Sequence, residues 1–246
     1  MRMFFFSLIL LLSLNACAQN NIETLYCKGL DAAASGDFEL AVNCFSKCIK
    51  TDSGFVQAWF NRGLARSYSG DFAGAISDYS RAIEIDSDFA LAWLNRGADR
   101  KEIGDTIGAF NDYSKAIEID SHYALAWYNR GIILYEQKNY EAAHRDFSDA
   151  IVCDSSMADA FYNRALANMR LNQLDAALHD LDKTVLLDKN YAVAYKKKGM
   201  IHFYLKNEDE ARKDFLFALS LNPEDCQSWK WLGLIEMDGD DRKNGL

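Results

Sequence analysis

Charged residues that recur at a fixed spacing are the first candidates for chemistry in this chain. A basic residue recurs at six places: Lys28, Arg62, Arg96, Arg130, Arg164 and Lys198. In five cases an aspartate follows sixteen residues later: Asp78, Asp112, Asp146, Asp180 and Asp214. Repetition indicates a structural device, so each arginine is predicted to bond the aspartate of a partner helix; the alternative is separate solvated charges. Such partly exposed pairs contribute about 0.2–1 kcal/mol each, so Arg130→Met is expected to cost little stability.

Other residue types that could catalyse a reaction lack the spacing that their chemistry needs. The four histidines share no metal-ligand spacing, and the acidic stretch 238–241 lacks the calcium-loop pattern. The sequence holds neither a glycine-rich phosphate loop nor a nucleophile elbow. We therefore predict no enzyme, no catalytic residue, no metal site, no cofactor and no small-molecule substrate.

The N-terminal residues have the form of an export signal with a site for modification. A short basic start precedes an apolar run, residues 4–14, which is shorter than the roughly 20 residues that a membrane span needs. The exit, Leu14-Asn15-Ala16-Cys17, resembles the bacterial lipobox. This resemblance implies a signal peptide over 1–16 and lipidation of Cys17. One alternative is cleavage after Ala18, which gives a free soluble protein, and another is a buried N-terminal helix.

The composition favours helices and argues against one class of partner. The chain has 246 residues, a single proline and no alternating strand pattern, which predicts an all-α protein. Its net charge of −9 comes without a basic stripe. Nucleic acid is therefore not an expected partner, because binding to phosphates needs clustered cations.

An internal repeat of 34 residues runs through the chain. The phrase Ala58–Gly63 recurs at Ala92–Gly97, Ala126–Gly131 and Ala160–Ala165. Extending the register gives six units without an insertion: 22–55, 56–89, 90–123, 124–157, 158–191 and 192–225. A tether, residues 17–21, precedes them, and a closing helix, 226–237, and a polar tail, 238–246, follow.

The units share an aromatic residue, a glycine four residues on, an alanine twelve after that and a second aromatic four later. This pattern resembles the tetratricopeptide repeat over 22–237, although serine stands at most places where that family often has proline. The resemblance implies a right-handed α-solenoid of six helical hairpins plus a C-terminal capping helix, with the first helices lining a concave groove. One hairpin cannot bury its apolar faces alone, so neighbouring hairpins must stack.

Small residues are expected where the two helices of a unit approach closely, as at Gly63 on a first helix and Ala75 on its second. Bulky residues such as Trp59 and Tyr79 are expected to fill the space between units. First helices are expected to end in a left-handed residue, which suits Gly36, Gly70, Gly104 and Asn172 better than Lys138 and Lys206.

The predicted groove carries a ladder of asparagines, one in each of four units. An amide donates and accepts hydrogen bonds, so a ladder can hold an extended backbone; alternatively, these side chains bond neighbouring helices. The predicted partner-binding residues are Phe60, Asn61, Leu64, Leu94, Asn95, Tyr128, Asn129, Ile132, Tyr135, Tyr162, Asn163, Met169, Lys197 and Phe203. The basic run Lys196–Lys198 would orient an acidic ligand end, or else is a solvated charge run.

Together these features predict a lipid-anchored scaffold that binds proteins through its concave groove. The expected partners are one or more envelope proteins or peptide segments. The expected location is the bacterial cell envelope, at the outer membrane facing the periplasm, with the lipid as the only membrane contact. The alternative is a soluble periplasmic or secreted holdase that binds unfolded or extended polypeptides.

Overall fold

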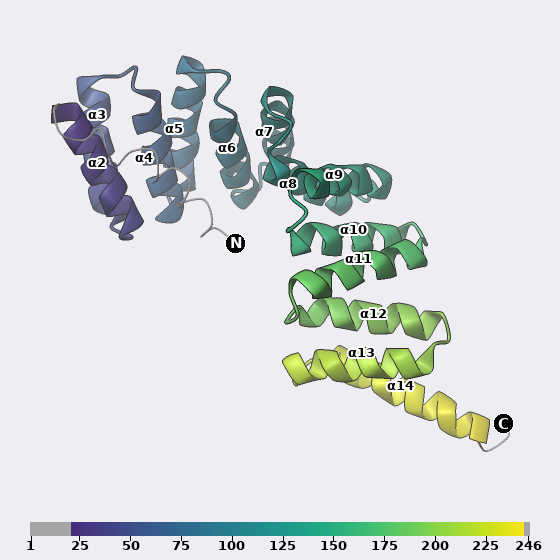
Figure 1. Ribbon diagram of the computed structural model, residues 1–246. Helices are drawn as coiled ribbons and strands as arrows, with labels where there is room; N and C mark the ends of the chain where they lie inside the picture. The colour runs from purple at the N-terminus through teal and green to yellow at the C-terminus, as the bar shows by residue number, and fades with distance from the viewer. Residues whose placement is uncertain (1–20, 244–246) are drawn as a thin grey trace. The chain divides into compact units, whose positions relative to one another are not determined.

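The computed structural model describes residues 21–243, which form helices α2 to α14 and no strand (Figure 1). The first helices of six hairpins are α2 (Asn21–Ala34), α4 (Val56–Tyr68), α6 (Ala90–Glu102), α8 (Ala124–Glu136), α10 (Ala158–Arg170) and α12 (Ala192–Tyr204). The second helices are α3 (Phe38–Thr51), α5 (Phe72–Ile85), α7 (Thr106–Ile119), α9 (Tyr140–Cys153), α11 (Leu174–Leu187) and α13 (Glu208–Leu221), and α14 (Cys226–Lys243) follows them. The predicted all-α helical repeat solenoid is confirmed.

The chain divides into two compact units. Unit 1 runs to Ala126 and unit 2 begins at Trp127, so the boundary falls inside α8. Within each unit, every helix packs against the next one along the chain, as α4 does against α5 and α12 against α13. The predicted signal peptide, the lipidation site Cys17 and residues 18–20 lie outside the described residues. In the described part of the chain, no helix is both long and apolar enough to cross a membrane.

Short polar side chains mark both ends of the second helices. A side-chain oxygen accepts a hydrogen bond from the N–H three residues on at Asp37, Asp71, Asp105 and Asn139, which satisfies a donor that the helix leaves open. Beyond the second helix, an aspartate accepts from the N–H two residues on, at Asp52, Asp86, Asp120, Asp154 and Asp188. These Asx turns fix the bend beside the serines that replace proline.

All six first helices are followed by a residue with positive φ. The angles are 83° at Gly36, 87° at Gly70, 86° at Gly104, 63° at Lys138, 59° at Asn172 and 63° at Lys206. The expected left-handed ends are thus confirmed, including the two lysines, for which this conformation costs about 1–2 kcal/mol.

The close approach within a hairpin is made by a glycine and an aromatic ring. A Cβ atom built on Gly63 would lie 2.7 Å from Cε1 of Tyr79, and one on Gly97 would lie 2.8 Å from Cε1 of Tyr113. In the fifth hairpin, Ala165 replaces the glycine and the smaller Leu181 replaces the aromatic ring. The two side chains lie in one buried cluster. The ring and the missing side chain therefore form a matched pair.

The last helix differs in length from the predicted closing helix. α14 continues to Lys243, whereas the sequence pattern ended it at 237. No proline interrupts the additional residues, and the single glycine there, Gly239, costs only about 1 kcal/mol, too little to end a helix by itself.

Gly97→Ala is expected to destabilise the protein by about 1–3 kcal/mol, because the added methyl group overlaps the Tyr113 ring. The double variant Gly97→Ala/Tyr113→Leu copies the fifth hairpin and should recover part of the loss. Gly233→Ala is the matched control, since no described atom lies within 4 Å of a Cβ there. Urea unfolding followed by circular dichroism measures all three, and wild-type stability of Gly97→Ala would refute the matched-pair account.

Candidate functional site

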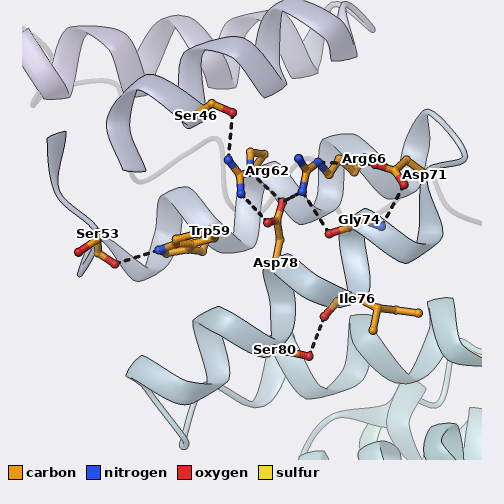
Figure 2. Close-up of polar contacts among 10 residues, drawn as sticks. All are labelled: Ser46, Ser53, Trp59, Arg62, Arg66, Asp71, Gly74, Ile76, Asp78 and Ser80. Atoms are coloured by element: carbon orange, nitrogen blue, oxygen red, sulfur yellow. Dashed lines mark hydrogen bonds and ion pairs between the residues drawn. The ribbon is translucent and has the colours of Figure 1, made fainter. Parts of the chain in front are cut away.

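The recurring ion pair is part of a network that joins two hairpins (Figure 2). The Arg62 guanidinium of α4 donates two hydrogen bonds to the Asp78 carboxylate of α5, Nε to Oδ2 at 2.8 Å and Nη2 to Oδ1 at 2.7 Å. Arg66, one turn on, donates to the same carboxylate at 2.9 Å. Arg62 also donates to the Ser46 hydroxyl of α3 at 3.0 Å, and its Cζ lies 4.8 Å from the Trp59 ring centroid.

The same two-point contact recurs in the next three hairpins. Its distances are 2.9 and 2.8 Å for Arg96–Asp112, 2.7 and 2.9 Å for Arg130–Asp146, and 2.9 and 2.6 Å for Arg164–Asp180. The link to the preceding hairpin recurs as Arg96–Ser80 at 3.0 Å and Arg164–Ser148 at 3.1 Å. The predicted pairing of each arginine with its aspartate is confirmed.

The predicted weakness of these pairs is wrong, because the carboxylates are buried. Asp78 and Asp112 are 1% exposed, Asp180 is 2% exposed and Asp146 is 5% exposed. A carboxylate that loses its cation in such surroundings remains as an uncompensated charge, which costs about 3–5 kcal/mol. The arginines are therefore committed to the scaffold and cannot also serve a ligand.

The sixth hairpin satisfies its aspartate less completely. Nζ of Lys198 lies 3.8 Å from Asp214 and only 2.7 Å from Asp182, while Nδ1 of His202 lies 2.7 Å from Asp214. Burial raises the pKa of Asp214, and the lowering effects of Lys198 and His202 do not offset that rise. A lysine is a point charge and cannot reproduce the two-pronged contact of arginine.

Two of the ladder asparagines are bonded within the protein. Nδ2 of Asn61 donates to the Gln57 carbonyl at 2.9 Å and to the Tyr26 hydroxyl at 2.6 Å. Asn163 repeats this arrangement, with its Nδ2 3.1 Å from the Tyr128 hydroxyl. At these two places the structure supports the alternative in which the asparagine bonds a neighbouring helix.

The other two asparagines are less engaged. Among the residues that the structure describes, Asn95 donates only to the carbonyl of Leu91 on its own helix, at 2.7 Å. Asn129 makes no side-chain hydrogen bond to any residue that the structure describes, and it is half-buried. The amide of Asn129 is therefore the member of the ladder best able to bond a ligand.

Four of the predicted partner-binding residues belong to the core. Phe60, Leu94 and Tyr128 are 3%, 4% and 6% exposed, and Asn61 is 6% exposed. The Phe60 ring packs on Tyr79 of its own hairpin, with 5.7 Å between ring centroids. Tyr128 likewise packs on Phe147 of its own second helix, and Asn61 bonds Tyr26 of α2. The assignment of these four buried side chains to the groove is therefore corrected: they cannot contact a partner.

The remaining predicted residues are half-buried: Leu64, Asn95, Asn129, Ile132, Tyr135, Tyr162, Asn163, Met169, Lys197 and Phe203. Leu64 and Asn95 lie in unit 1. The others lie on α8, α10 and α12, within unit 2. We call these eight residues, together with Arg170, the unit 2 surface.

The three consecutive lysines of α12 have different surroundings. Nζ of Lys196 lies 3.0 Å from the Asp225 carboxylate, and that of Lys198 lies 2.7 Å from Asp182. Among the described residues, no carboxylate lies within ion-pair distance of Lys197. The expected solvated charge run is therefore two paired lysines around one that lacks an acidic partner.

Lys197 lies in a basic environment. Burial, Lys196 and Arg170 all lower the pKa of its ammonium group. Arg170 itself donates from Nε to the Tyr135 hydroxyl at 3.3 Å, and no carboxylate within the described chain pairs with it. The unit 2 surface thus holds two cations, Lys197 and Arg170, that have no carboxylate partner among the described residues.

Arg170 belongs to this surface but was not predicted from the sequence. The same place in the two preceding hairpins holds Glu102 and Glu136. The change from glutamate to arginine at this place in the repeat was therefore the sequence signal that could have identified Arg170. As for other ligands, no group of histidine, cysteine, aspartate and glutamate residues within the described ranges could hold a metal ion.

Helical hairpins that expose one face of their first helices define a class of repeat proteins that bind other proteins. Tetratricopeptide-repeat patterns match residues 56–89, 124–156 and 192–225, and a TPR-repeat pattern matches 100–138. The chain belongs to the tetratricopeptide-repeat family.

Solved structures share this fold. A chain of the APC/C hetero-tetramer Cut9–Hcn1 is 19% identical, with a TM-score of 0.67 over 87% of this chain, which spans only 42% of that one. YrrB, described as a TPR protein with an unusual peptide-binding site, is 19% identical, with a TM-score of 0.68 over 76% of this chain and 96% of its own. MamA is 26% identical, with a TM-score of 0.62 over 67% and 96%. No curated protein matches the chain significantly.

Arg130→Met is expected to lower the free energy of unfolding by about 3 kcal/mol, because the buried Asp146 loses its cation. Arg130→Met/Asp146→Leu removes both charges and should recover most of that loss. Urea unfolding is the measurement, since urea does not screen charges. A single variant as stable as the wild type would show that Asp146 is solvated.

Proposed function

We propose that this protein is a scaffold that binds an acidic, extended segment of another protein on the unit 2 surface. The tetratricopeptide-repeat fold supports a protein–protein interaction scaffold. The observation that carries the more specific proposal is the pair of cations Lys197 and Arg170. Every other arginine on a described first helix is paired with a carboxylate, in a protein whose net charge is −9.

An acidic side chain of the partner would bond Lys197 and stabilise the protonated form of its ammonium group, which burial and the neighbouring cations disfavour. A charge-assisted hydrogen bond of this kind contributes about 1.5–3 kcal/mol. The amide of Asn129 can bond the partner's backbone in either direction. Met169 and Tyr162 offer half-buried apolar surface on α10, so the partner's apolar side chains also gain burial.

This arrangement serves binding rather than catalysis. Four of the recurring aspartates, Asp78, Asp112, Asp146 and Asp180, are held in ion pairs with arginine, so they cannot accept a proton from a substrate. We therefore propose that the protein is not an enzyme. YrrB, which has the same fold and a peptide-binding site, supports a peptide as the kind of ligand.

We further propose that the protein is a lipoprotein of the bacterial cell envelope, anchored through Cys17 and located at the outer membrane facing the periplasm. The basic start, the apolar run and Leu14–Cys17 support this location. Buried acyl chains contribute about 0.8 kcal/mol per CH2, so several chains would hold the scaffold at the membrane. Its partners would then be envelope proteins.

A holdase that binds unfolded chains is the second candidate. The apolar side chains Ile132, Met169 and Phe203 of the unit 2 surface favour it, because they would accept apolar segments regardless of charge. The two functions differ in their dependence on Lys197.

Lys197→Gln is expected to weaken binding of a fluorescein-labelled octaglutamate peptide about tenfold or more, measured by fluorescence anisotropy at low salt. Lys189→Gln, at an exposed position with no part in this surface, is the control and should change affinity little. Equal affinity in the wild type and Lys197→Gln would overturn the acidic-segment proposal. Binding of a reduced, unfolded protein that ignores the substitution would favour the holdase.

The same peptide should dissociate as the pH rises. Its binding needs the protonated form of Lys197, whose pKa lies below the ordinary lysine value, so affinity is lost as the pH rises through that lowered pKa. Lys197→Arg should keep binding to higher pH, because a guanidinium stays charged. Identical pH profiles for the two proteins would show that another group controls binding.

Mass spectrometry of the protein from its native membrane fraction tests the anchor. A mature N-terminus at an acylated Cys17 is expected, and Cys17→Ser should release the protein from membranes. A mature N-terminus at Gln19 would instead support the free soluble form.

A further inference from the structure

The sixth hairpin changes both cations that hold its aspartate. Lys198 stands in the place of Arg62 and His202 in the place of Arg66, the two guanidinium donors of the second hairpin. Nδ1 of His202 lies 2.7 Å from the Asp214 carboxylate, whereas Nζ of Lys198 lies 3.8 Å from it. The imidazole therefore makes the short contact that a guanidinium makes in the earlier hairpin.

A second carboxylate holds Lys198 away from Asp214. The place of Ser46, whose hydroxyl accepts from Arg62 of the next hairpin, is taken by Asp182 on α11. Nζ of Lys198 lies 2.7 Å from Asp182. Burial opposes the charge of Lys198, but Asp182 and Asp214 together raise its pKa above the ordinary lysine value. One ammonium group is thus shared between two carboxylates.

These four residues form a cluster that joins α11, α12 and α13, and we call it the junction cluster: Asp182, Lys198, His202 and Asp214. With a neutral imidazole the cluster carries one negative charge in excess, and one added proton makes it neutral. The buried carboxylate of the second hairpin instead contacts two guanidinium groups, which keep their charge at any pH that the protein meets. The junction cluster therefore depends on a proton where the second hairpin does not.

The other charged groups on the helices around the junction cluster are held in ion pairs of their own. These pairs are Glu210–Lys213 on α13, Glu236 of α14 with Arg212, and Asp180 of α11 with Arg164. Glu210 interacts electrostatically with the cluster, and the hydrogen bond from Lys213 lowers its pKa. His179 of α11 is exposed and lies 3.9 Å from Asp180. Carboxylates and guanidinium groups do not ordinarily titrate between pH 6 and 8, so the proton of the cluster is the charge that changes there.

The direction of the pH effect follows from the buried carboxylate. Burial raises the pKa of Asp214, and the lowering effects of Lys198 and His202 are smaller. A group whose pKa is higher in the folded than in the opened chain stabilises the fold at low pH, and this stability is lost as the pH rises through the folded pKa. A carboxylate and an imidazole in direct contact titrate as a pair, and histidine brings that titration toward the range between pH 5 and 8.

We propose that the junction cluster is a pH-sensitive fastening, which takes up one proton as the pH falls and then holds the sixth hairpin more firmly on the fifth. Helix α14 follows the sixth hairpin, because its Leu232 and Ile235 share a buried cluster with Phe215 of α13. Opening at the junction would therefore release α12, α13 and α14 together, as a local unfolding step. Since α12 carries Lys197, acid would also steady that part of the unit 2 surface, a consequence that rests on the proposed function, whereas the fastening itself does not.

Hydrogen–deuterium exchange of the intact protein without ligand, read by mass spectrometry, tests the fastening. After correction for the intrinsic exchange rate, peptides from α12, α13 and α14 should be protected about tenfold more at pH 6 than at pH 8, which corresponds to a difference of one pKa unit between the closed and open states. Peptides from α4 and α5, whose aspartate is held by guanidinium groups, should show no such rise.

Two substitutions that copy the earlier hairpins should remove the pH dependence. Asp182→Ser restores the serine and leaves Lys198 to Asp214, and the Asp182 side chain is 63% exposed, so packing is undisturbed. His202→Arg restores the second guanidinium. Both variants should show the higher protection already at pH 8, and circular dichroism checks their folding. His179→Gln is the control and should behave as the wild type.

Equal protection of the wild type at the two pH values would overturn the proposal. So would a pH dependence that persists unchanged in Asp182→Ser or in folded His202→Arg, or one that is lost in His179→Gln. Because no ligand is present, these outcomes are independent of whether the unit 2 surface binds an acidic segment.

Discussion

The buried aspartate of the second helices α5, α7, α9 and α11 is the constraint on which the scaffold depends. A carboxylate that is 1% exposed, such as Asp78, must be matched by a cation of the same hairpin, and Arg62 meets it with two hydrogen bonds. Because Arg62 also bonds Ser46 of the preceding hairpin, one side chain fixes both the pairing within a hairpin and the register between hairpins. The glycine–ring contact then sets how closely the two helices can lie.

This use of charge inside the scaffold determines which charges remain for partners. Arginines on the described first helices pair with carboxylates up to α10, and there Arg170 breaks the pattern together with Lys197 on α12. At α14 the network ends differently, since a leucine replaces the arginine and the glycine is left open. Function is thus proposed where unit 2 departs from its own repeat.

The features that recur from hairpin to hairpin can be predicted from the sequence, because each hairpin packs its two helices in the same way. The helical hairpins, the Arg–Asp partners and the left-handed ends follow from the 34-residue period. Burial does not follow, because it depends on neighbouring hairpins; for that reason the sequence alone understates the strength of the ion pairs. The assignment of Phe60 to the groove fails because a first helix is apolar on more than one face, and helical periodicity does not show which face meets the second helix. Arg170 departs from the repeat, so the recurring pattern by itself does not point to it.

Side-chain NMR of the protein titrated with octaglutamate tests most directly whether scaffold charges and partner-binding charges are separate sets. The account predicts that the Lys197 ammonium and Arg170 guanidinium resonances shift together on binding, while the guanidinium of Arg164, held by Asp180 at 2.6 and 2.9 Å, keeps its position. A shift of Arg164 without one at Lys197 would contradict it, since the buried network would then be the site that the ligand reaches.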